Sequence, residues 1–427
     1  MKGASTFRML LDRLDGEEAP GSAVITKSPQ SLLSVLRFTS QILFPKYPHA
    51  LFPLLFILRM HSLKRSGEVV LKCVPRELFR SLVPGPLQGD VESSILIGHG
   101  LLDTLKVSGP RWLQLARPSH STATLVRATP IAGLPHAVAL ATEDLWHNVH
   151  NRLGLTTAES LVIVDYVKFT SHIASKVVLG LLRPTCNLES SLMDASLDVF
   201  FQRPRYLCVG DIFSVYVEKY ESGHCSVESL YFKVVEFEGP NYTKELSSSD
   251  RNIVVGFHVV KGHTAVVQAS DQNEFLPPRT HIFVPGPCQV TGENYRSFLL
   301  PACPPGPDRC CGELVSLLQP FLSGKRPGLP ALRIRPVFLL RGPCGSGKRT
   351  AAHAAARSLG LRMWEVDCLE LCGSSPGQAE GKLKFVFTRA KQYSPCIVLL
   401  RNIHVRRSVV WNANIKLHSY LFTINLL

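Results

Sequence analysis

The chain has 427 residues, which is enough for about three domains of ordinary size. Hydrophobic residues make up 45% of it and charged residues 19%, a balance that excludes a disordered chain and indicates packed cores. The formal net charge of +14 would suit a polyanion, but aromatic residues are not interleaved with the basic clusters, so we expect no nucleic acid as a partner.

Residues 1–94 have mixed patterns and are predicted to form a poorly defined N-terminal region. The first residues lead into charged positions and lack the apolar core of a secretory signal. The apolar run Leu51–Leu58 contains a proline and is far shorter than the roughly 20 residues that cross a bilayer, so we expect no transmembrane segment. Ser31–Phe38 is compatible with a short helix and Val69–Val74 with a strand.

A first β-rich domain is predicted over residues 95–190. Trp112–Arg117 and Thr122–Ala128 have the composition of two strands joined by a turn, and Leu161–Val167 is another apolar, β-branched run. Ile173–Leu182 fits either a helix or a strand, because periodicity does not separate the two in so short an apolar segment.

A second, β-barrel-like domain is predicted over residues 191–286, because strand-like runs recur there at a spacing of about 10 to 20 residues. The runs are Asp211–Val217, Leu230–Val235, Ile253–Val260, Thr264–Ala269 and Thr280–Val284. Residues 287–309 are dense in proline and are predicted to be a linker between domains.

Residues 310–407 alternate between strand and helix patterns, which is the order of a nucleotide-binding α/β domain with a parallel sheet. The first element is a helix over Gly312–Gln319 that we expect to end at Pro320, with Leu314, Leu317 and Leu318 on its apolar face. The later elements are a strand from Val337, an alanine-rich helix over Lys348–Leu359 that ends at Gly360, a strand over Met363–Cys368, a helix over Gly381–Tyr393 with Leu383, Val386, Phe387 and Ala390 on its inner face, and a buried strand over Cys396–Leu400.

The loop before the helix at Lys348 has the pattern of a phosphate-binding loop. Gly342, Gly347 and Lys348 satisfy three of the four constrained positions of G-x-x-x-x-G-K-[ST], between a strand and a helix. The glycines let backbone N–H groups curl around phosphate oxygens, the helix N-terminus adds partial positive charge, and the lysine reaches the β- and γ-phosphates. The predicted ATP-binding residues are Gly342, Pro343, Cys344, Gly345, Ser346, Gly347, Lys348, Arg349 and Thr350. A glycine turn before an ordinary helix is the alternative.

Charge and cysteine usage in this region fit a nucleotide site better than a metal site. Between Leu332 and Arg407 there are fourteen Lys and Arg residues and four carboxylates, an excess that a polyphosphate explains in part. The twelve cysteines of the chain include no C-x-x-C pair, which argues against a zinc site and indicates reduced thiols in a cytosolic protein.

Over residues 95 to 405 the chain resembles the AAA+ ATPases, and more closely their peroxin-6 branch. The resemblance rests on Gly342–Lys348, Gly377–Glu380, Phe387–Ala390 and Pro395–Leu400, which together are similar to the first ATPase cassette of that family. It is weaker upstream, where Trp112–Ala116 and Phe201–Asp211 are similar to the paired N-terminal barrels. The implied fold class is multidomain: β-rich barrel domains followed by an incomplete α/β P-loop domain. Another AAA+ protein with β-barrel N-domains is the alternative.

Three positions depart from the pattern that hydrolysis requires. The Ser or Thr that holds Mg²⁺ is replaced by Arg349, and Thr350 lies about 100° further around the helix. Hydrolysis also needs one carboxylate for the metal and another that orients water. By the resemblance these two directly follow Leu400, where this chain has Arg401 and Asn402. We therefore expect ATP binding without turnover, no catalytic residues and degenerate Mg²⁺ ligands, as is implied for first cassettes of this branch.

Two further departures concern substrate grip and the end of the chain. The residues before Gly377 are Ser375 and Pro376, so the aromatic residue with which AAA+ translocases usually grip substrate is missing from this loop. The tail over residues 408–427 no longer resembles the family, which suggests a truncated or mis-spliced product. Tyr420–Ile424 could add a surrogate strand to a sheet that lacks its usual central one.

The resemblance implies a role in peroxisome biogenesis. Such a protein would assemble with a peroxin-1-like AAA+ ATPase into a heterohexamer that extracts and recycles the ubiquitinated peroxisomal import receptor. It would be cytoplasmic and bound to the cytosolic face of the peroxisomal membrane through a membrane-anchored adaptor. A catalytically silent nucleotide-binding scaffold is the alternative function.

Overall fold

A computed structural model of the chain describes residues 66–83, 90–105, 111–117, 122–155, 160–165, 172–182, 190–221, 224–239, 252–322, 336–371, 376–403 and 419–425. All of them belong to the unit Arg65–Leu427. The short helix predicted over Ser31–Phe38 and the loop position Ser375 lie outside the described residues. Within the described part, no helix is both long and apolar enough to cross a membrane.

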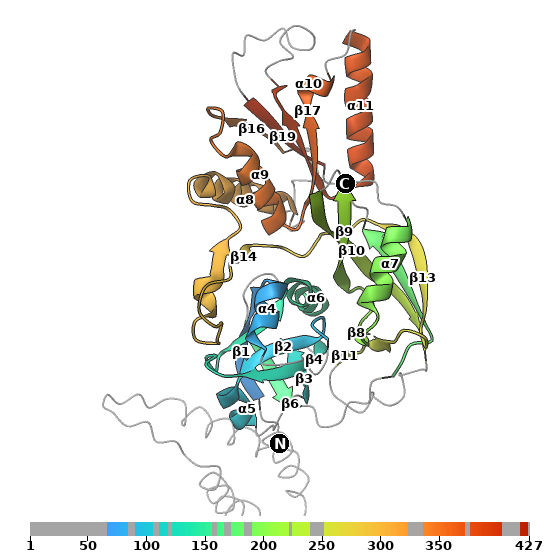
Figure 1. Cartoon of the computed structure of the whole chain (residues 1–427), viewed down its shortest axis with the longest axis vertical. Helices are drawn as coiled ribbons and strands as arrows, with labels where there is room; N and C mark the ends of the chain where they lie inside the picture. Colours follow the sequence, from blue (N-terminus) through green and yellow to red (C-terminus); the bar gives the residue numbers. More distant parts are fainter. Residues whose placement is uncertain are drawn as a thin grey trace, which may run out of the picture. The chain divides into compact units, whose positions relative to one another are not determined.

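The first part is a closed six-stranded β-barrel (Figure 1). Its strands pair in the order β4-β2-β5-β1-β6-β3, and β3 returns to β4, so the sheet has no free edge. The pairs β1–β5 and β2–β4 are parallel and the others antiparallel. The strands are β1 (Ser66–Val74), β2 (Ser94–Gly98), β3 (Arg111–Ala116), β4 (Thr122–Ile131), β5 (Val138–Thr142) and β6 (Ser160–Asp165).

The barrel differs from the predicted first domain in where it starts. The strands expected near Trp112, Thr122 and Leu161 are present, and so is the one expected at Val69–Val74. This last strand, β1, pairs with β5 and β6, so the barrel begins before the expected start at residue 95. The sequence could not reveal this because both partners of β1 lie far along the chain.

Three helices, α4 (Arg76–Leu82), α5 (His99–Leu105) and α6 (Glu143–Leu153), follow strands of the barrel. Helix α6 has clear end signals: the Thr142 side chain accepts the backbone N–H of Leu145 at 3.4 Å, and Gly154 ends the helix with φ of 62°. Its apolar residues Leu145, Val149 and Leu153 belong to the buried core of the barrel.

The second module is an open, mixed sheet and not the β-barrel-like domain predicted over residues 191–286. Its strands pair in the order β13-β7-β10-β9, and a separate pair joins β12 to β8. The segment Ile173–Leu182, left open by the sequence, contributes strand β7. The elements are β7 (Lys176–Leu182), α7 (Ser190–Phe200), β8 (Arg205–Leu207), β9 (Ile212–Glu221), β10 (His224–Glu238), β12 (Phe257–Val259) and β13 (Ala265–Gln272).

The run predicted as one strand over Ile253–Val260 is split in two. Strand β11 (Asn252–Val254) joins β4 of the barrel, whereas β12 pairs with β8. Gly256 lies at the break, where a Cβ atom would come within 2.2 Å of the Leu207 carbonyl oxygen. Only glycine allows this approach of two backbones, so the chain can leave one sheet and enter another here.

A buried set of polar side chains, the barrel network, joins α6 to the start of β9. Arg152 donates from Nε to Asp211 at 2.8 Å, and Asn148 exchanges two hydrogen bonds of 2.9 Å with the backbone of Ile212. The side chains of Arg152 and Asp211 are 7% and 2% exposed. Because these charges and amides are buried and mutually satisfied, the network fixes the second module against the barrel.

The proline-dense segment predicted as a linker over residues 287–309 is structured. Strand β14 (His281–Phe283) pairs with β15 (Leu299–Pro301), and the 3₁₀-helix η1 (Tyr295–Phe298) lies between them. Tyr295 and Phe298 are 3% and 4% exposed and pack into a cluster with residues of α4, β4 and β5. The segment is therefore held against the barrel and is not a free spacer.

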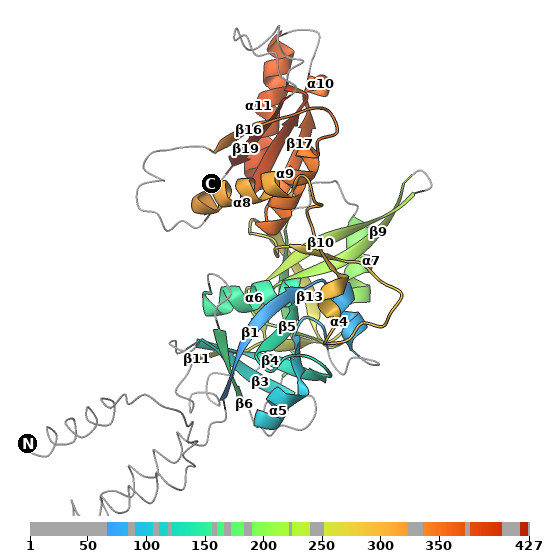
Figure 2. The ribbon, with the colours of Figure 1, turned by 90° about the vertical axis from the view of Figure 1, so that its left-hand side faces the viewer.

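The last part is a four-stranded sheet with helices on both faces (Figure 2). Helices α8 and α9 share one buried cluster with Ile397 and Leu399, and α11 packs on the other face with Val398 and Leu400. The elements are α8 (Asp308–Leu322), β16 (Val337–Arg341), α9 (Lys348–Ser358), β17 (Arg362–Asp367), α10 (Cys368–Leu371), α11 (Pro376–Gln392), β18 (Cys396–Arg401) and β19 (Ser419–Asn425).

This sheet is mixed, not parallel throughout as predicted. The order is β16-β19-β18-β17, and β19 runs antiparallel to both neighbours, which confirms the surrogate strand near Tyr420–Ile424. The inner face expected for α11 is confirmed by Leu383, Val386, Phe387 and Ala390 in the core.

Two expectations for α8 were wrong. The helix runs on to Leu322, past Pro320. Leu317 is 52% exposed, while Leu314 and Leu318 are buried.

Candidate functional site

The predicted phosphate-binding loop joins strand β16 to helix α9. Gly345 and Gly347 have φ of 78° and 76°, a left-handed backbone that glycine adopts without strain. The helix starts at once after the loop, with the N–H of Ala351 bonded to the Gly347 carbonyl at 2.8 Å. The backbone thus provides the tight turn and the open helix N-terminus on which phosphate binding depends.

Lys348 lies over this loop. Its Nζ donates to the carbonyl oxygens of Gly342 and Pro343 at 3.0 and 2.6 Å, and to the Ser346 hydroxyl at 3.1 Å. Pro343, Cys344 and Ser346 are exposed, so the outer side of the loop faces solvent. The ammonium group is therefore held against the oxygen atoms of the loop itself.

Arg349, at the position that usually carries a hydroxyl for Mg²⁺, contacts a carboxylate of the neighbouring strand. Its Nη2 donates to Glu365 Oε2 at 2.8 Å, and its Nε lies 2.8 Å from Oε1. His353, one turn further along α9, meets the same carboxylate at 3.3 Å. Thr350 is exposed. The structure thus places the whole predicted run at one end of α9, with Arg349 turned toward β17.

The residues that follow Leu400 also contact the carboxylates of strand β17. Arg401 lies 3.2 Å from Glu365 and 3.7 Å from Asp367. Asn402, with φ of 53°, donates its amide to both oxygens of Asp367 at 3.0 Å. We call this cluster the loop network; its members are Arg349, His353, Glu365, Asp367, Arg401 and Asn402.

Opposite charges and hydrogen bonds stabilise the ionised form of both carboxylates in the loop network. Burial acts to raise the pKa of Glu365, but hydrogen bonds from Arg349 and His353 outweigh it and hold the pKa below its ordinary value. The backbone N–H of Leu369 and the amide of Asn402 lower the pKa of Asp367. Both side chains therefore stay negative at neutral pH, Asp367 bonded to the amide of Asn402 and Glu365 Oε1 in ion pairs with Arg349 and Arg401 at 2.8 and 3.2 Å.

These residues do not fit Mg²⁺. The ion needs several oxygen ligands at near-octahedral positions, at least one from a carboxylate or hydroxyl of the protein. At the loop, the two nearby carboxylates are contacted by Arg349, Arg401 and Asn402, and the two positions that should supply oxygen are guanidinium groups. In the described part of the chain, no group of three or more His, Cys, Asp or Glu side chains could hold a metal ion.

The sequence analysis missed Glu365 and Asp367, the carboxylates at the centre of the loop network. The signal was present, because two acidic residues at alternate positions near the end of a strand lie on one face. Strands β17 and β18 are parallel, with Asp367 opposite Arg401. Pairing the two strand ends would therefore have brought these charges together.

The far end of α9 is held by the segment that leaves the second module. The N–H of Leu276 donates to the Gly360 carbonyl at 2.7 Å, and the N–H of Arg279 to the Arg357 carbonyl at 2.9 Å. Gly360 has φ of 65°, and a Cβ atom there would lie 2.0 Å from the Leu276 carbonyl oxygen. The helix that carries the loop is thus fixed at its C-terminal end by backbone contacts.

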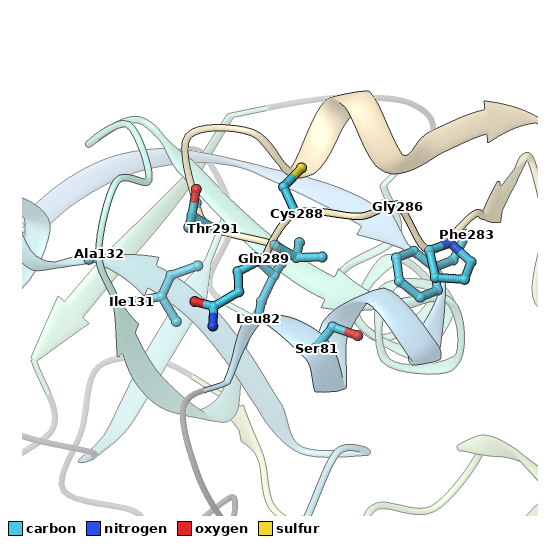
Figure 3. Close-up of a pocket in the computed structure, with 12 residues that line it drawn as sticks. Ser81, Leu82, Ile131, Ala132, Phe283, Gly286, Cys288, Gln289 and Thr291 are labelled. Carbon is cyan, nitrogen blue, oxygen red and sulfur yellow. The ribbon is translucent and has the colours of Figure 1, made fainter.

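A cavity of about 510 Å³ lies beside the barrel, away from the loop network (Figure 3). Figure 3 shows Ser81 and Leu82 from α4, Ile131 from β4, and Cys288 and Gln289 from the segment after β14 around it. Its described lining contains no carboxylate, histidine, lysine or arginine. We therefore assign no phosphate chemistry to this cavity.

Comparisons with known proteins show which proteins this chain is similar to. Residues 338–410 match the family model of the "ATPase family associated with various cellular activities (AAA)". The chain is 30% identical over 235 residues to "Peroxisomal ATPase PEX6" of Arabidopsis thaliana, covering 52% of this chain and 22% of that protein. It is 42% identical over 100 residues to "Peroxisomal ATPase PEX6" of Cricetulus griseus, covering 23% and 10%.

A second kind of relative matches a shorter stretch. The chain is 39% identical over 66 residues to "Protein mac-1" of Caenorhabditis elegans, covering 16% of this chain and 8% of that protein. In each of these three comparisons the chain spans less than a quarter of the relative's length. An AAA ATPase domain is present, and the resemblance to a peroxin-6-like AAA+ ATPase is confirmed.

Proposed function

We propose that this chain supplies the N-terminal barrel region and the first, nucleotide-holding cassette of a peroxin-6-like AAA+ ATPase. In this role it would bind ATP at Gly342–Thr350 and retain it without hydrolysis. The observation that carries the proposal is the contrast at the loop: Lys348 is held over a glycine turn that suits phosphate, while the Arg401 and Asn402 positions offer no carboxylate.

Hydrolysis would fail at this site for a chemical reason. A water molecule that attacks the terminal phosphate must lose a proton and be held in line, tasks usually given to a carboxylate and a metal. Asn402 cannot accept that proton, and its amide is bound to Asp367. Glu365 and Asp367 are occupied by the cations and amides of the loop network, so they do not replace the missing groups.

By its similarity to the peroxisomal ATPases, we propose the same setting for this chain. It would assemble with a peroxin-1-like AAA+ ATPase in a heterohexamer at the cytosolic face of the peroxisomal membrane, reached through a membrane-anchored adaptor. The assembly would extract the ubiquitinated import receptor for another round of import. A nucleotide-holding cassette serves such an assembly by keeping subunit contacts in place while other sites turn over.

The test is nucleotide binding and turnover by the 427-residue chain and by Lys348→Ala. Titration with a fluorescent ATP analogue should give saturable binding that Lys348→Ala weakens by at least about tenfold, because one charge-assisted phosphate contact is lost. Phosphate release should stay at the level without protein for both. Equal affinity of the two proteins for the analogue would refute the site. ATP turnover that depends on Lys348 would refute the claim that the cassette does not hydrolyse ATP.

A nucleotide-binding scaffold that works outside the peroxisomal assembly is the second candidate, favoured by the loss of every expected metal-facing oxygen. Affinity capture of the chain with peroxin-1 as bait distinguishes the two candidate functions. Co-elution that ATP strengthens supports the peroxisomal role. Failure to co-elute at micromolar concentration supports the scaffold.

A further inference from the structure

The loop network places an anion where a P-loop site holds a cation. In metal-dependent P-loop sites, one Mg²⁺ bridges the hydroxyl after the loop lysine and a carboxylate at the end of a neighbouring strand. Here those positions are Arg349 and Arg401, and both contact one carboxylate, that of Glu365, at 2.8 and 3.2 Å. The charges of the site are therefore inverted: a carboxylate lies between two guanidinium groups.

Such an arrangement selects an anion and repels a divalent cation. Arg349 and Arg401 are permanently charged, and guanidinium groups bind phosphate through two parallel N–H donors. Lys348, the neighbour of Arg349 in the chain, adds a third cationic side chain, which lies over the loop. Mg²⁺ would be repelled by these cationic side chains and would find no carboxylate oxygen free to bind it. A terminal phosphate, in contrast, would be attracted by the guanidinium and ammonium groups.

Exposure allows the exchange of partners. The side chain of Arg349 is 57% exposed and that of Arg401 31%, while Glu365 is 18% exposed. The Nε atom of Arg401 is buried and has no hydrogen-bond partner in the described part of the chain. A phosphate group could therefore approach from solvent and take the place of Glu365 as the acceptor for these donors.

From this geometry, and resting on the proposed nucleotide site, we propose that the cassette binds a nucleoside triphosphate free of metal, whose terminal phosphate replaces Glu365 as the partner of Arg349 and Arg401. Glu365 is then a competitor that holds the two guanidinium groups until the ligand arrives. Nucleotide binding by this cassette is independent of Mg²⁺, and the arginines provide the charge that the ion provides elsewhere.

The experiment measures ATP affinity of the full chain by isothermal titration calorimetry, once in millimolar Mg²⁺ and once in EDTA. The matched variants are Arg349→Ala and Arg357→Ala, which remove one charge each from opposite ends of α9, with Lys348→Ala as the test of the site itself. Arg349 and Arg357 are both exposed, and far-UV circular dichroism would check that each variant retains its fold.

We expect affinity in EDTA to equal or exceed affinity in Mg²⁺. Arg349→Ala should weaken binding in EDTA by about tenfold, the loss of one charge-assisted phosphate contact, and Arg357→Ala by less than about twofold. Arg349→Lys, which keeps the charge without the planar fork, should fall between them.

A drop of tenfold or more in EDTA, or Arg349→Ala binding like the parent chain, would overturn the inference and leave the nucleotide site standing. No ATP binding, or Lys348→Ala binding like the parent, would overturn the proposed function and the inference with it.

Discussion

The barrel network and the loop network are built from the same residue types, and water reaches them to different extents. In the barrel network, Arg152 and Asp211 are 7% and 2% exposed, and every contact is internal. In the loop network, Arg349 and Arg401 are 57% and 31% exposed around a mostly buried carboxylate. A buried ion pair with satisfied hydrogen bonds can only hold elements together, because breaking it leaves an unpaired charge in the interior. A half-exposed one can give up a partner to a ligand.

The largest effect expected from this comparison is on the barrel network. Asp211→Asn removes the charge that faces Arg152 and should lower the free energy of unfolding by about 3 to 5 kcal/mol, because a buried guanidinium loses its counter-charge. Urea denaturation followed by circular dichroism measures it. The matched control is Asp198→Asn, which breaks an exposed pair with Lys261 in the same module and should cost at most about 1 kcal/mol. Equal losses would show that burial does not separate the two kinds of pair.

A second expected effect concerns pH and arises on the same helix as Arg152. Burial lowers the pKa of His147 to about 4, and the Asn151 amide lies 2.9 Å from its Nε2, where the neutral ring accepts. The folded chain thus binds fewer protons than the unfolded chain between pH 6.5 and 4, so stability falls as the pH drops through this window. The loss should amount to up to about 3 kcal/mol.

Thermal unfolding of the parent chain and of His147→Gln between pH 7 and pH 4 tests this. The variant should lose less stability on acidification. His136→Gln, at an exposed position, is the control and should behave as the parent does. Parallel pH profiles for all three proteins would show that His147 does not titrate as its burial requires.

The smallest expected effect on stability, and the clearest on binding, is at the loop network. Glu365→Gln should change the free energy of unfolding by about 1 kcal/mol or less, because Arg349 and Arg401 can turn toward water. The same variant should bind metal-free ATP about threefold to tenfold more tightly, since one competing charge is removed. Calorimetric titration in EDTA measures both the sign and the size. Weaker binding would mean that Glu365 positions the arginines and does not compete with the ligand.

The sequence predicted local elements well where a single hydrophobic periodicity or a single loop motif determines the element. The glycine loop, the alanine-rich helix ended by Gly360 and the inner face of α11 depend on neighbours within a few turns, and all are present. In the β-rich parts, strands β1, β3, β4, β6, β9, β10 and β13 were also predicted, whereas β2, β5 and β8 were not. The start of the barrel at β1 was not, because its partners β5 and β6 are remote in sequence.

The site was predicted at the loop but not around it. Arg349, Arg401 and Asn402 could be identified as replacements for oxygen ligands, because the motif fixes those positions. Their contacts with Glu365 and Asp367 depend on the order of strands in the sheet, where β19 separates β16 from β18. Similarly, Gly256 and Gly360 are required by backbone approaches from distant segments, which no local pattern contains.

The central claim is that this cassette holds ATP and does not cleave it. The most direct measurement is to saturate the chain with radiolabelled ATP, separate it from free nucleotide after several hours, and denature it to identify what was bound. We expect intact ATP in near-stoichiometric amount, and none on Lys348→Ala. Recovery of ADP on the parent chain, or of ATP in equal amount on Lys348→Ala, would contradict the account.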